Sequence, residues 1–265
     1  MRSRVSLRVA LACCVSAGAL SACAVKRVAL PTGPGTPFPD AAPAYEQAVK
    51  DCRSVRTIRA TLGLSGRAGS TSLRGNVDAG FEAPEKIRLE GRHPLGRPVF
   101  ILASPGPQTT LYMPRENRVM QNASATDIVE ALVGLRLAPH DLRTLVSGCG
   151  FGVGQPSEGR QYGNGLVAVT VAGATTYIRQ EQGRWQVVGS TRPPLSVLYS
   201  DFTSGRPSTL RLQASGTPAA DVTVRLSDVN INVPLESEVF AVDVPAGAQP
   251  LTMEELRRAG PLGGA

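Results

Sequence analysis

The sequence has few of the side chains that usually carry covalent or metal chemistry. It contains only two histidines, His93 and His140, and no motif joins them. The patterns G-x-S-x-G, H-E-x-x-H and G-x-x-x-x-G-K-[ST] are absent, which excludes the hydrolase, zinc-protease and nucleotide sites that they build. The acids Asp127, Glu130 and Asp141 fall on predicted helix surfaces, where solvation or capping explains them. We therefore expect no catalytic residue, no metal and no cofactor.

Nucleotide and nucleic-acid binding also lack support. The glycine-rich stretch 148–154 has no helical pattern after it, so it fails as a dinucleotide loop and is typical of a flexible connection. The formal charge of +7 falls to +4 once three N-terminal arginines are removed with the segment described next. A mildly basic chain of this kind does not indicate a nucleic-acid partner.

The N-terminus lacks an apolar run long enough to span a bilayer. A basic start is followed by the short apolar run 9–20, which is typical of a secretory signal peptide over residues 1–22. The run ends in Leu20-Ser21-Ala22-Cys23, which resembles the lipobox of bacterial lipoproteins. That resemblance implies cleavage before Cys23 and acylation of Cys23, enough for stable anchoring. An ordinary secretory signal that leaves Cys23 free is the alternative.

Localisation follows from the residues around Cys23. Residues 24–25 lack the aspartate that resembles an inner-membrane retention signal, which favours the outer membrane, with the domain facing the periplasm. Residues 23–44 hold five prolines and are predicted to form an extended tether. At about 3.1 Å per residue, it would reach about 60 Å.

Two cysteines remain in the mature chain besides Cys23. Cys13 and Cys14 leave with the signal, so Cys52 and Cys149 form an even pair in an oxidising compartment. A disulfide and two buried free thiols are both consistent with this count.

The body, residues 45–245, shows the period-two pattern of β-strands, followed by a tail over 246–265. About eleven strands without βαβ alternation predict a mainly β (α+β) domain with a single curved antiparallel sheet. Helical patterns are confined to a few segments, and a last strand is expected at Val239 to Val244. The expected helices are Ala44 to Arg53, a pair between Ser124 and Gly148, and a short one at Met253 to Arg258.

One predicted turn carries an unusual residue. In the stretch Lys86 to Leu102, two strands flank His93-Pro94-Leu95-Gly96, which has the composition of a tight turn. Turn tips are usually polar, yet Leu95 occupies this one. Either Leu95 contacts an apolar partner or it folds back on its own sheet.

Three stretches together resemble the outer-membrane lipoprotein acceptor LolB and, more broadly, the LolA/LolB superfamily. They are the lipobox with its tether, the strand–Pro94-Leu95-Gly96–strand segment, and the two helices within Asp127 to Cys149. The resemblance implies a half-barrel of eleven strands with a helical lid over an apolar cavity. It further implies that acyl chains of lipoprotein cargo arrive from a LolA-like periplasmic carrier and pass to membrane lipid without covalent chemistry. Leu95 would then be the membrane-contacting residue.

The cavity lining is predicted from apolar positions on the strands and helices. Periodicity alone is equally consistent with a packed core. The predicted lining residues are Leu89, Phe100, Leu102, Leu111, Ile128, Leu132, Leu135, Leu142 and Leu145.

Two features depart from the family pattern, and two other functions remain open. Trp185 is the only tryptophan, and the chain continues past the expected end of the family domain. A structural or regulatory envelope lipoprotein could use this fold to bind a protein partner. An envelope enzyme acting on lipid or glycan would need a cleft with converging carboxylates.

Overall fold

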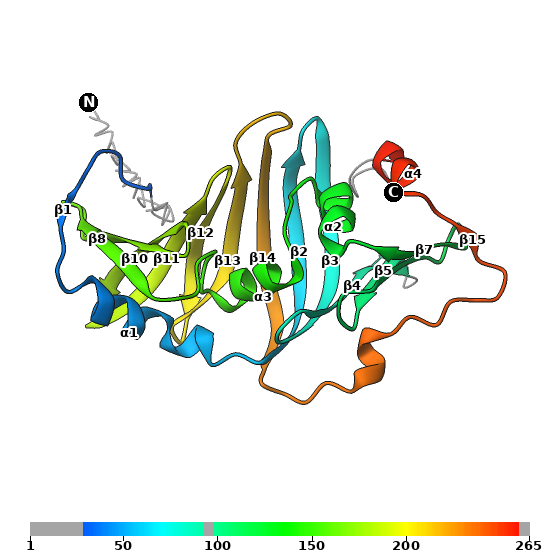
Figure 1. Cartoon of the computed structure of the whole chain (residues 1–265), viewed down its shortest axis with the longest axis horizontal. Coiled ribbons are helices and arrows are strands. Elements are labelled where there is room, and N and C mark those ends of the chain that lie inside the picture. The colour runs from blue at the N-terminus through cyan, green and yellow to red at the C-terminus, as the bar shows by residue number, and fades with distance from the viewer. Residues whose placement is uncertain (1–28, 93–97, 260–265) are drawn as a thin grey trace, which may run out of the picture.

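The computed structural model describes residues 29–92 and 98–259, which form one large, open, curved sheet with four α-helices (Figure 1). The helices are α1 (Ala41–Arg53), α2 (Ala125–Val133), α3 (Pro139–Ser147) and α4 (Met253–Ala259). The strands are β1 (Thr36–Pro37), β2 (Thr57–Ala68), β3 (Thr71–Glu82), β4 (Lys86–Arg92), β5 (Pro98–Ser104), β6 (Thr109–Met113), β7 (Arg118–Ala123), β8 (Pro156–Gln161), β9 (Leu166–Val171), β10 (Ala174–Glu181), β11 (Arg184–Arg192), β12 (Leu195–Thr203), β13 (Arg206–Ala214), β14 (Ala220–Ile231) and β15 (Gln249–Pro250).

The sheet consists of two antiparallel meanders, β2–β7 and β8–β14, that meet where β14 pairs with β2. This pairing brings the end of the second meander against the start of the first. The two outer edges are covered by the chain's own extensions, β1 on β8 and β15 on β7. Both two-residue strands contain a proline, Pro37 or Pro250, and such short proline-bearing edges resist further strand addition.

The predicted mainly β class is confirmed, but the described residues form fifteen strands rather than about eleven. The pattern missed β8, which has a largely polar sequence and lies next to the edge strand β1, and the two-residue strands β1 and β15. These strands bury few side chains, so no alternation of apolar and polar residues marks them. The predicted tether also contains part of this fold, since β1 and the first residues of α1 lie within 23–44.

Local signals place the helices correctly. The Ser124 side chain accepts a hydrogen bond from the backbone N–H of Asp127 at the start of α2. Pro139 opens α3, and Gly148 ends it with a positive φ of 90°. Pro43 lies in the first turn of α1, where its missing N–H would have had no helical partner. Among the described residues, no helix is long and apolar enough to cross a membrane.

The strand predicted at Val239 to Val244 is wrong. That segment begins in a 3₁₀ helix, Ser237–Phe240, and continues without a strand. The Arg88 guanidinium instead donates hydrogen bonds to the carbonyls of Val239 and Ala241, at 3.1 and 2.9 Å. The preceding strand β14 is already paired on both sides, so this segment had no neighbouring strand edge to join.

The C-terminal segment connects β14 to the far edge of the sheet. Phe240 is fully buried beneath the Lys86 ammonium, which lies 5.5 Å from the ring centroid. Farther on, the backbone N–H of Leu251 donates to Val119 at 2.7 Å, and α4 then packs against α2. The tail therefore reaches the helices that cover the sheet (Figure 1).

Acidification is expected to release α4 from this position. Hydrogen bonds from Thr252 and Arg118 to the Glu255 carboxylate lower its pKa to about 2. A carboxyl group whose pKa is depressed on folding stabilises the folded form above its unfolded pKa, and this stabilisation is lost as pH falls through the folded value. Hydrogen exchange of α4 amides should therefore accelerate as pH falls from about 4.5 to about 2, after correction for intrinsic exchange.

Two variants extend this experiment. Glu255→Gln removes the charge of the carboxylate, and Glu254→Gln is the matched control on the helix surface. Glu255→Gln should expose the α4 amides already at neutral pH, whereas Glu254→Gln should not, because Glu254 pairs only with Arg258 on the helix surface. Unchanged protection of α4 at about pH 2 would contradict the prediction.

Candidate functional site

A small apolar cavity lies between the middle of the sheet and the pair α2–α3. Its volume is about 80 Å³, and all eighteen residues that line it are Leu, Val or Phe. They come from β2, β3, β4, β5, β13 and β14 on the sheet side and from the segment 129–146 on the other. The lining residues are Leu62, Leu64, Val77, Phe81, Leu89, Phe100, Val129, Leu132, Val133, Leu135, Leu137, Leu142, Leu145, Val146, Leu210, Leu212, Val222 and Val224.

Six of the nine predicted lining residues lie on this cavity: Leu89, Phe100, Leu132, Leu135, Leu142 and Leu145. The other three, Leu102, Leu111 and Ile128, are fully buried in the surrounding core. Leu102 and Leu111 are register partners on β5 and β6; β6 contributes no residue to the cavity wall, and β5 contributes only Phe100. Their apolar side chains pack against neighbours there, as in any core.

The prediction missed the contribution of β2, β3, β13 and β14. Leu62 and Leu64 alternate on β2, and Leu210 and Leu212 alternate on β13, so each strand by itself showed an apolar face. What the sequence did not show is that β14 pairs with β2, which places Val224 directly opposite Leu64 and adds Val222 to the same wall.

The glycine on β4 makes room for one lining residue. A Cβ at Gly91 would lie 2.3 Å from the Phe100 ring, which is closer than carbon atoms approach without displacement. Gly91 and Phe100 are register partners on β4 and β5. The ring therefore occupies the space that a side chain at Gly91 would need, and it forms part of the cavity wall.

The helix α3 is fixed to the sheet and to α1 by several polar and covalent contacts. Arg192 on β11 donates two hydrogen bonds to the buried Asp141 carboxylate, at 2.7 and 2.8 Å, and this pairing raises the pKa of Arg192. The Tyr199 hydroxyl donates to the carbonyl of Leu145, and Cys149 is joined to Cys52 on α1 by a disulfide.

The segment that follows α3 is also fixed to the sheet. The stretch 148–154, expected to be flexible, is instead packed over its first half. The Tyr199 hydroxyl accepts a hydrogen bond from the N–H of Gly150 at 3.1 Å, and burial raises the pKa of that hydroxyl. A Cβ at Gly150 would lie 2.6 Å from Ser190, so glycine allows the close approach here.

The helix α2 has no comparable attachment. Its polar side chains Asp127 and Glu130 both pair with Arg136, just beyond the helix, at 2.7 Å each. Between α2 and the sheet, no side-chain hydrogen bond or ion pair occurs among the described residues. Apolar contacts of Ile128, Val129 and Leu132 hold α2 in place, and such contacts are not directional.

The connection between α2 and α3 spans residues 134–138 and begins with Gly134, which has a positive φ of 71°. A Cβ at Gly134 would lie 2.5 Å from the Cβ of Ala68 at the end of β2. α2 therefore ends at a residue that tolerates unusual backbone angles. Beside it, the lining residues Val133, Leu142 and Leu64 are only half-buried, so the cavity lies closest to solvent at this end.

The two predicted residues with the most specific roles, Cys23 and Leu95, lie outside the described residues, as does His93. His140 is about half-exposed at the start of α3, 3.4 Å from Asp141. In the described part of the chain, no group of three His, Cys, Asp or Glu side chains is placed to hold a metal ion.

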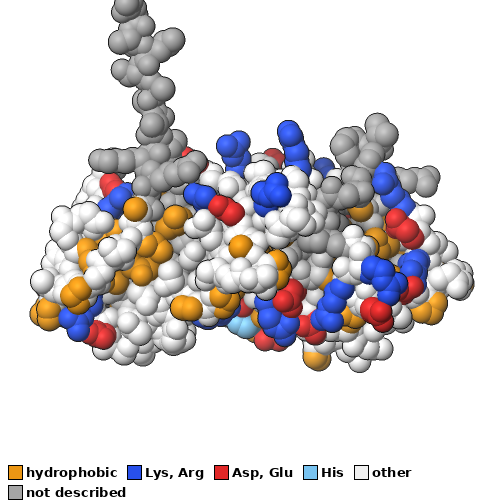
Figure 2. Space-filling view, turned by 90° about the horizontal axis from the view of Figure 1, so that it is seen from above, with side chains coloured by type: hydrophobic (Ala, Val, Ile, Leu, Met, Phe, Trp, Pro, Cys, Tyr) orange, Lys and Arg blue, Asp and Glu red, His pale blue; other side chains and the backbone are white. Residues whose placement is uncertain are grey.

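The surface is unevenly composed. Figure 2 looks down on the upper rim of Figure 1 and shows hydrophobic side chains gathered over the end formed by β8–β12. Lysine and arginine side chains stand over the middle and the opposite end.

The helix α1 packs against β8, β9 and β11. Just before this helix, Phe38 contacts the half-buried Trp185, with ring centroids 6.0 Å apart.

Comparison with known proteins gives similarity of fold only. No protein-family model and no curated protein matches the sequence. A LolA superfamily protein from Nitrosomonas europaea has a similar structure, with a TM-score of 0.47 and 10% identity over 75% of this chain and 94% of that one. A DUF1329 family protein from Desulfovibrio piger gives 0.48 and 11%, over 75% and 96%.

A third similar structure is lipoprotein LppX from Mycobacterium tuberculosis, with a TM-score of 0.33 and 10% identity over 74% of this chain and 97% of that one.

Proposed function

We propose that this protein is an envelope lipoprotein that holds an acyl chain between its sheet and α2. The observation that carries the proposal is the cavity wall, in which all eighteen residues are apolar. A ligand with hydrogen-bonding groups would lose its water there without compensation, whereas an acyl chain loses nothing polar. Each methylene buried there contributes about 0.8 kcal/mol.

The cavity is too small for an acyl chain as it stands. Ligand pockets usually measure about 300–1,000 Å³, whereas this cavity measures about 80 Å³. Loading therefore requires α2 to move outward about Gly134 while α3 stays in place. Hydrogen bonds and the disulfide fix α3, whereas non-directional apolar contacts hold α2. This difference supports a movement of α2 rather than of α3.

Delivery completes the proposed function. Acylated Cys23 anchors the protein in the outer membrane, and the domain faces the periplasm. A lipoprotein or lipid arrives from a LolA-like periplasmic carrier, and Leu95 contacts membrane lipid when the acyl chain is passed on. Burial of one leucine supplies about 2 kcal/mol, which biases contact without anchoring. No covalent bond is made or broken in this cycle.

Uptake of a fluorescent polyunsaturated fatty acid by the chain from residue 29 onward tests the proposal. We expect saturable binding, and amide exchange in α2 that is about tenfold faster than in α3 without ligand. Bound fatty acid should slow exchange in α2. A chain that takes up no fatty acid and protects α2 as well as α3 would contradict the proposal.

A second function is favoured by one observation, the small size of the cavity. A nearly filled core suits a structural or regulatory lipoprotein that binds a protein partner through its surface. The same fatty-acid experiment separates the two functions, because only the first requires the interior to open.

A further inference from the structure

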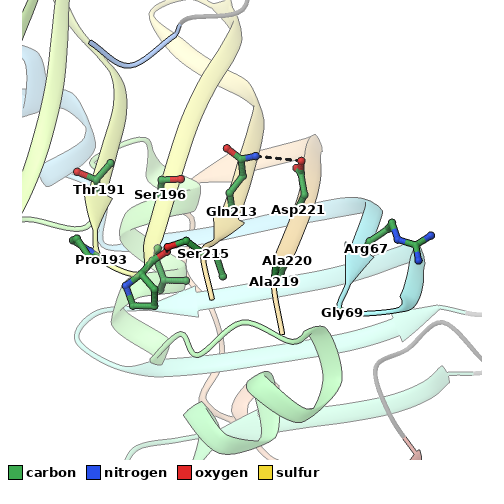
Figure 3. A pocket seen from close by; sticks show the side chains of 13 residues that line it. Arg67, Gly69, Thr191, Pro193, Ser196, Gln213, Ser215, Ala219, Ala220 and Asp221 are labelled. Carbon is green, nitrogen blue, oxygen red and sulfur yellow. Dashed lines mark hydrogen bonds between the residues drawn. The ribbon is translucent and has the colours of Figure 1, made fainter. Parts of the chain in front are cut away.

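A groove larger than the apolar cavity lies away from it, at the upper ends of β2 and β11–β14 (Figure 3). Its volume is about 610 Å³, within the usual range for ligand sites. It extends among three turns, which contribute Gly69, Pro193 with Pro194, and Ser215. It shares no residue with the lining of the apolar cavity.

A row of polar side chains crosses the floor of this groove. Successive register partners on five adjacent strands form it, one from each of β11, β12, β13, β14 and β2. In order, they are Thr191, Ser196, Gln213, Asp221 and Arg67. Neighbouring strands lie about 4.8 Å apart, so the row is about 19 Å long.

The row lies on the outer face of the sheet. Gln213 alternates with Leu212, and Asp221 alternates with Val222, and both of these apolar residues face the inner cavity. Figure 3 shows the Gln213 and Asp221 side chains pointing toward each other, with Ser196 beside them. The two sites therefore occupy opposite faces of the same strands.

Two hydroxyl groups of the row have unused hydrogen-bonding capacity. In the described structure, the side chains of Thr191 and Ser196 form no hydrogen bond. By contrast, the Asp221 carboxylate accepts hydrogen bonds from Gln213 at 3.2 Å and from both Nε and Nη2 of Arg211. The groove thus offers unpaired hydroxyls beside a carboxylate whose charge is already balanced.

The charges disfavour most ligand classes. Among the lining residues, an anion would find only the Arg67 guanidinium at the end of the row, because Arg211 already pairs with Asp221, and that pairing leaves no free carboxylate for a cation. An apolar ligand would strip water from the row without replacing its hydrogen bonds. An extended peptide gains most of its affinity by adding to a sheet edge, whereas this row crosses interior strands.

We propose that this groove binds an uncharged, hydroxyl-rich chain, namely a glycan strand. Sugar hydroxyls both donate and accept hydrogen bonds, which matches a row of hydroxyl, amide, carboxylate and guanidinium groups. The rings of Pro193 and Pro194 at one end supply apolar surface for the C–H faces of a sugar ring. Glycan binding at this groove does not depend on the proposed acyl-chain binding.

The test uses the full chain in lipid nanodiscs and two soluble probes, a β-1,4-linked N-acetylglucosamine tetrasaccharide and maltotetraose. Saturation-transfer NMR and titration should show saturable binding of at least one probe. The double variant Ser196→Val/Gln213→Met removes hydrogen-bonding groups at the centre of the row and should weaken that binding by about tenfold or more.

The control is Thr223→Val, on the same face of β14 but outside the groove, which should leave binding unchanged. Thermal unfolding of all variants checks that the sheet is intact. Absence of saturable binding to both tetrasaccharides would overturn the proposal. Equal binding by the double variant and the unmodified chain, or binding of an extended peptide at this groove in place of a glycan, would overturn it as well.

Discussion

Replacing Val222 with phenylalanine is expected to abolish most acyl-chain uptake while the protein stays folded. Val222 is 1% exposed and lines the apolar cavity from the centre of the sheet, on β14. The larger side chain would occupy much of the about 80 Å³ that is free there. Fatty-acid binding should fall by about tenfold or more, because the ring takes the place of the first methylenes to enter.

The stability cost of this substitution should be moderate. Added volume in a packed core usually costs about 1–3 kcal/mol, and here part of the added volume fills an existing hole. Urea unfolding measures that cost, and fluorescence titration measures binding. The matched control is Thr223→Phe, the next residue on the same strand, whose side chain points to the outer face. If Val222→Phe binds fatty acid as the unmodified chain does, the apolar cavity is not the binding site.

Removal of the disulfide between Cys52 and Cys149 is expected to destabilise the domain by about 2–5 kcal/mol. The bond joins residues 97 positions apart, so it closes a long loop and restricts the unfolded chain strongly. It also ties the end of α3 to α1, across the two halves of the molecule. Since domains of this size are stable by only about 5–15 kcal/mol, such a loss is a large fraction of the total.

Urea unfolding of the double variant Cys52→Ala/Cys149→Ala, compared with the unmodified chain, measures this loss. Both cysteines are buried, at 9% and 2% exposure, so alanine avoids placing a hydroxyl in the core. A reducing agent should lower the stability of the unmodified chain toward that of the variant and leave the variant unchanged. Equal stability with and without the reducing agent would show that the bond contributes little.

Local patterns in the sequence accounted for much of the secondary structure. The period-two alternation of Leu62 and Leu64 predicted a half-buried strand, and the Ser124 cap, Pro139 and Gly148 marked helix ends that the structure contains. These signals depend on residues close together in the chain, which is why they could be interpreted without tertiary structure. The polar strand β8 carried no such signal, because none of its side chains is fully buried.

The candidate sites were only partly predictable. Six of the predicted lining residues lie on the apolar cavity, but Leu102, Leu111 and Ile128 do not. An apolar residue on the inner face of a strand has the same pattern whether a neighbour fills the adjacent space or leaves it empty. The polar row from Thr191 to Arg67 was not predicted at all, since its five members belong to strands that are adjacent only after folding.

The sequence by itself determined the mainly β class and the positions of most strands and helices. It also predicts acylation of Cys23, which stays a prediction. Each of these depends on short-range patterns or on a motif. Only the tertiary structure decided that β14 joins β2, that α3 is tied to the sheet whereas α2 is not, and that a polar groove lies behind the apolar cavity. Those features arise from pairing between residues far apart in the chain, and local periodicity carries no information about which strands become neighbours.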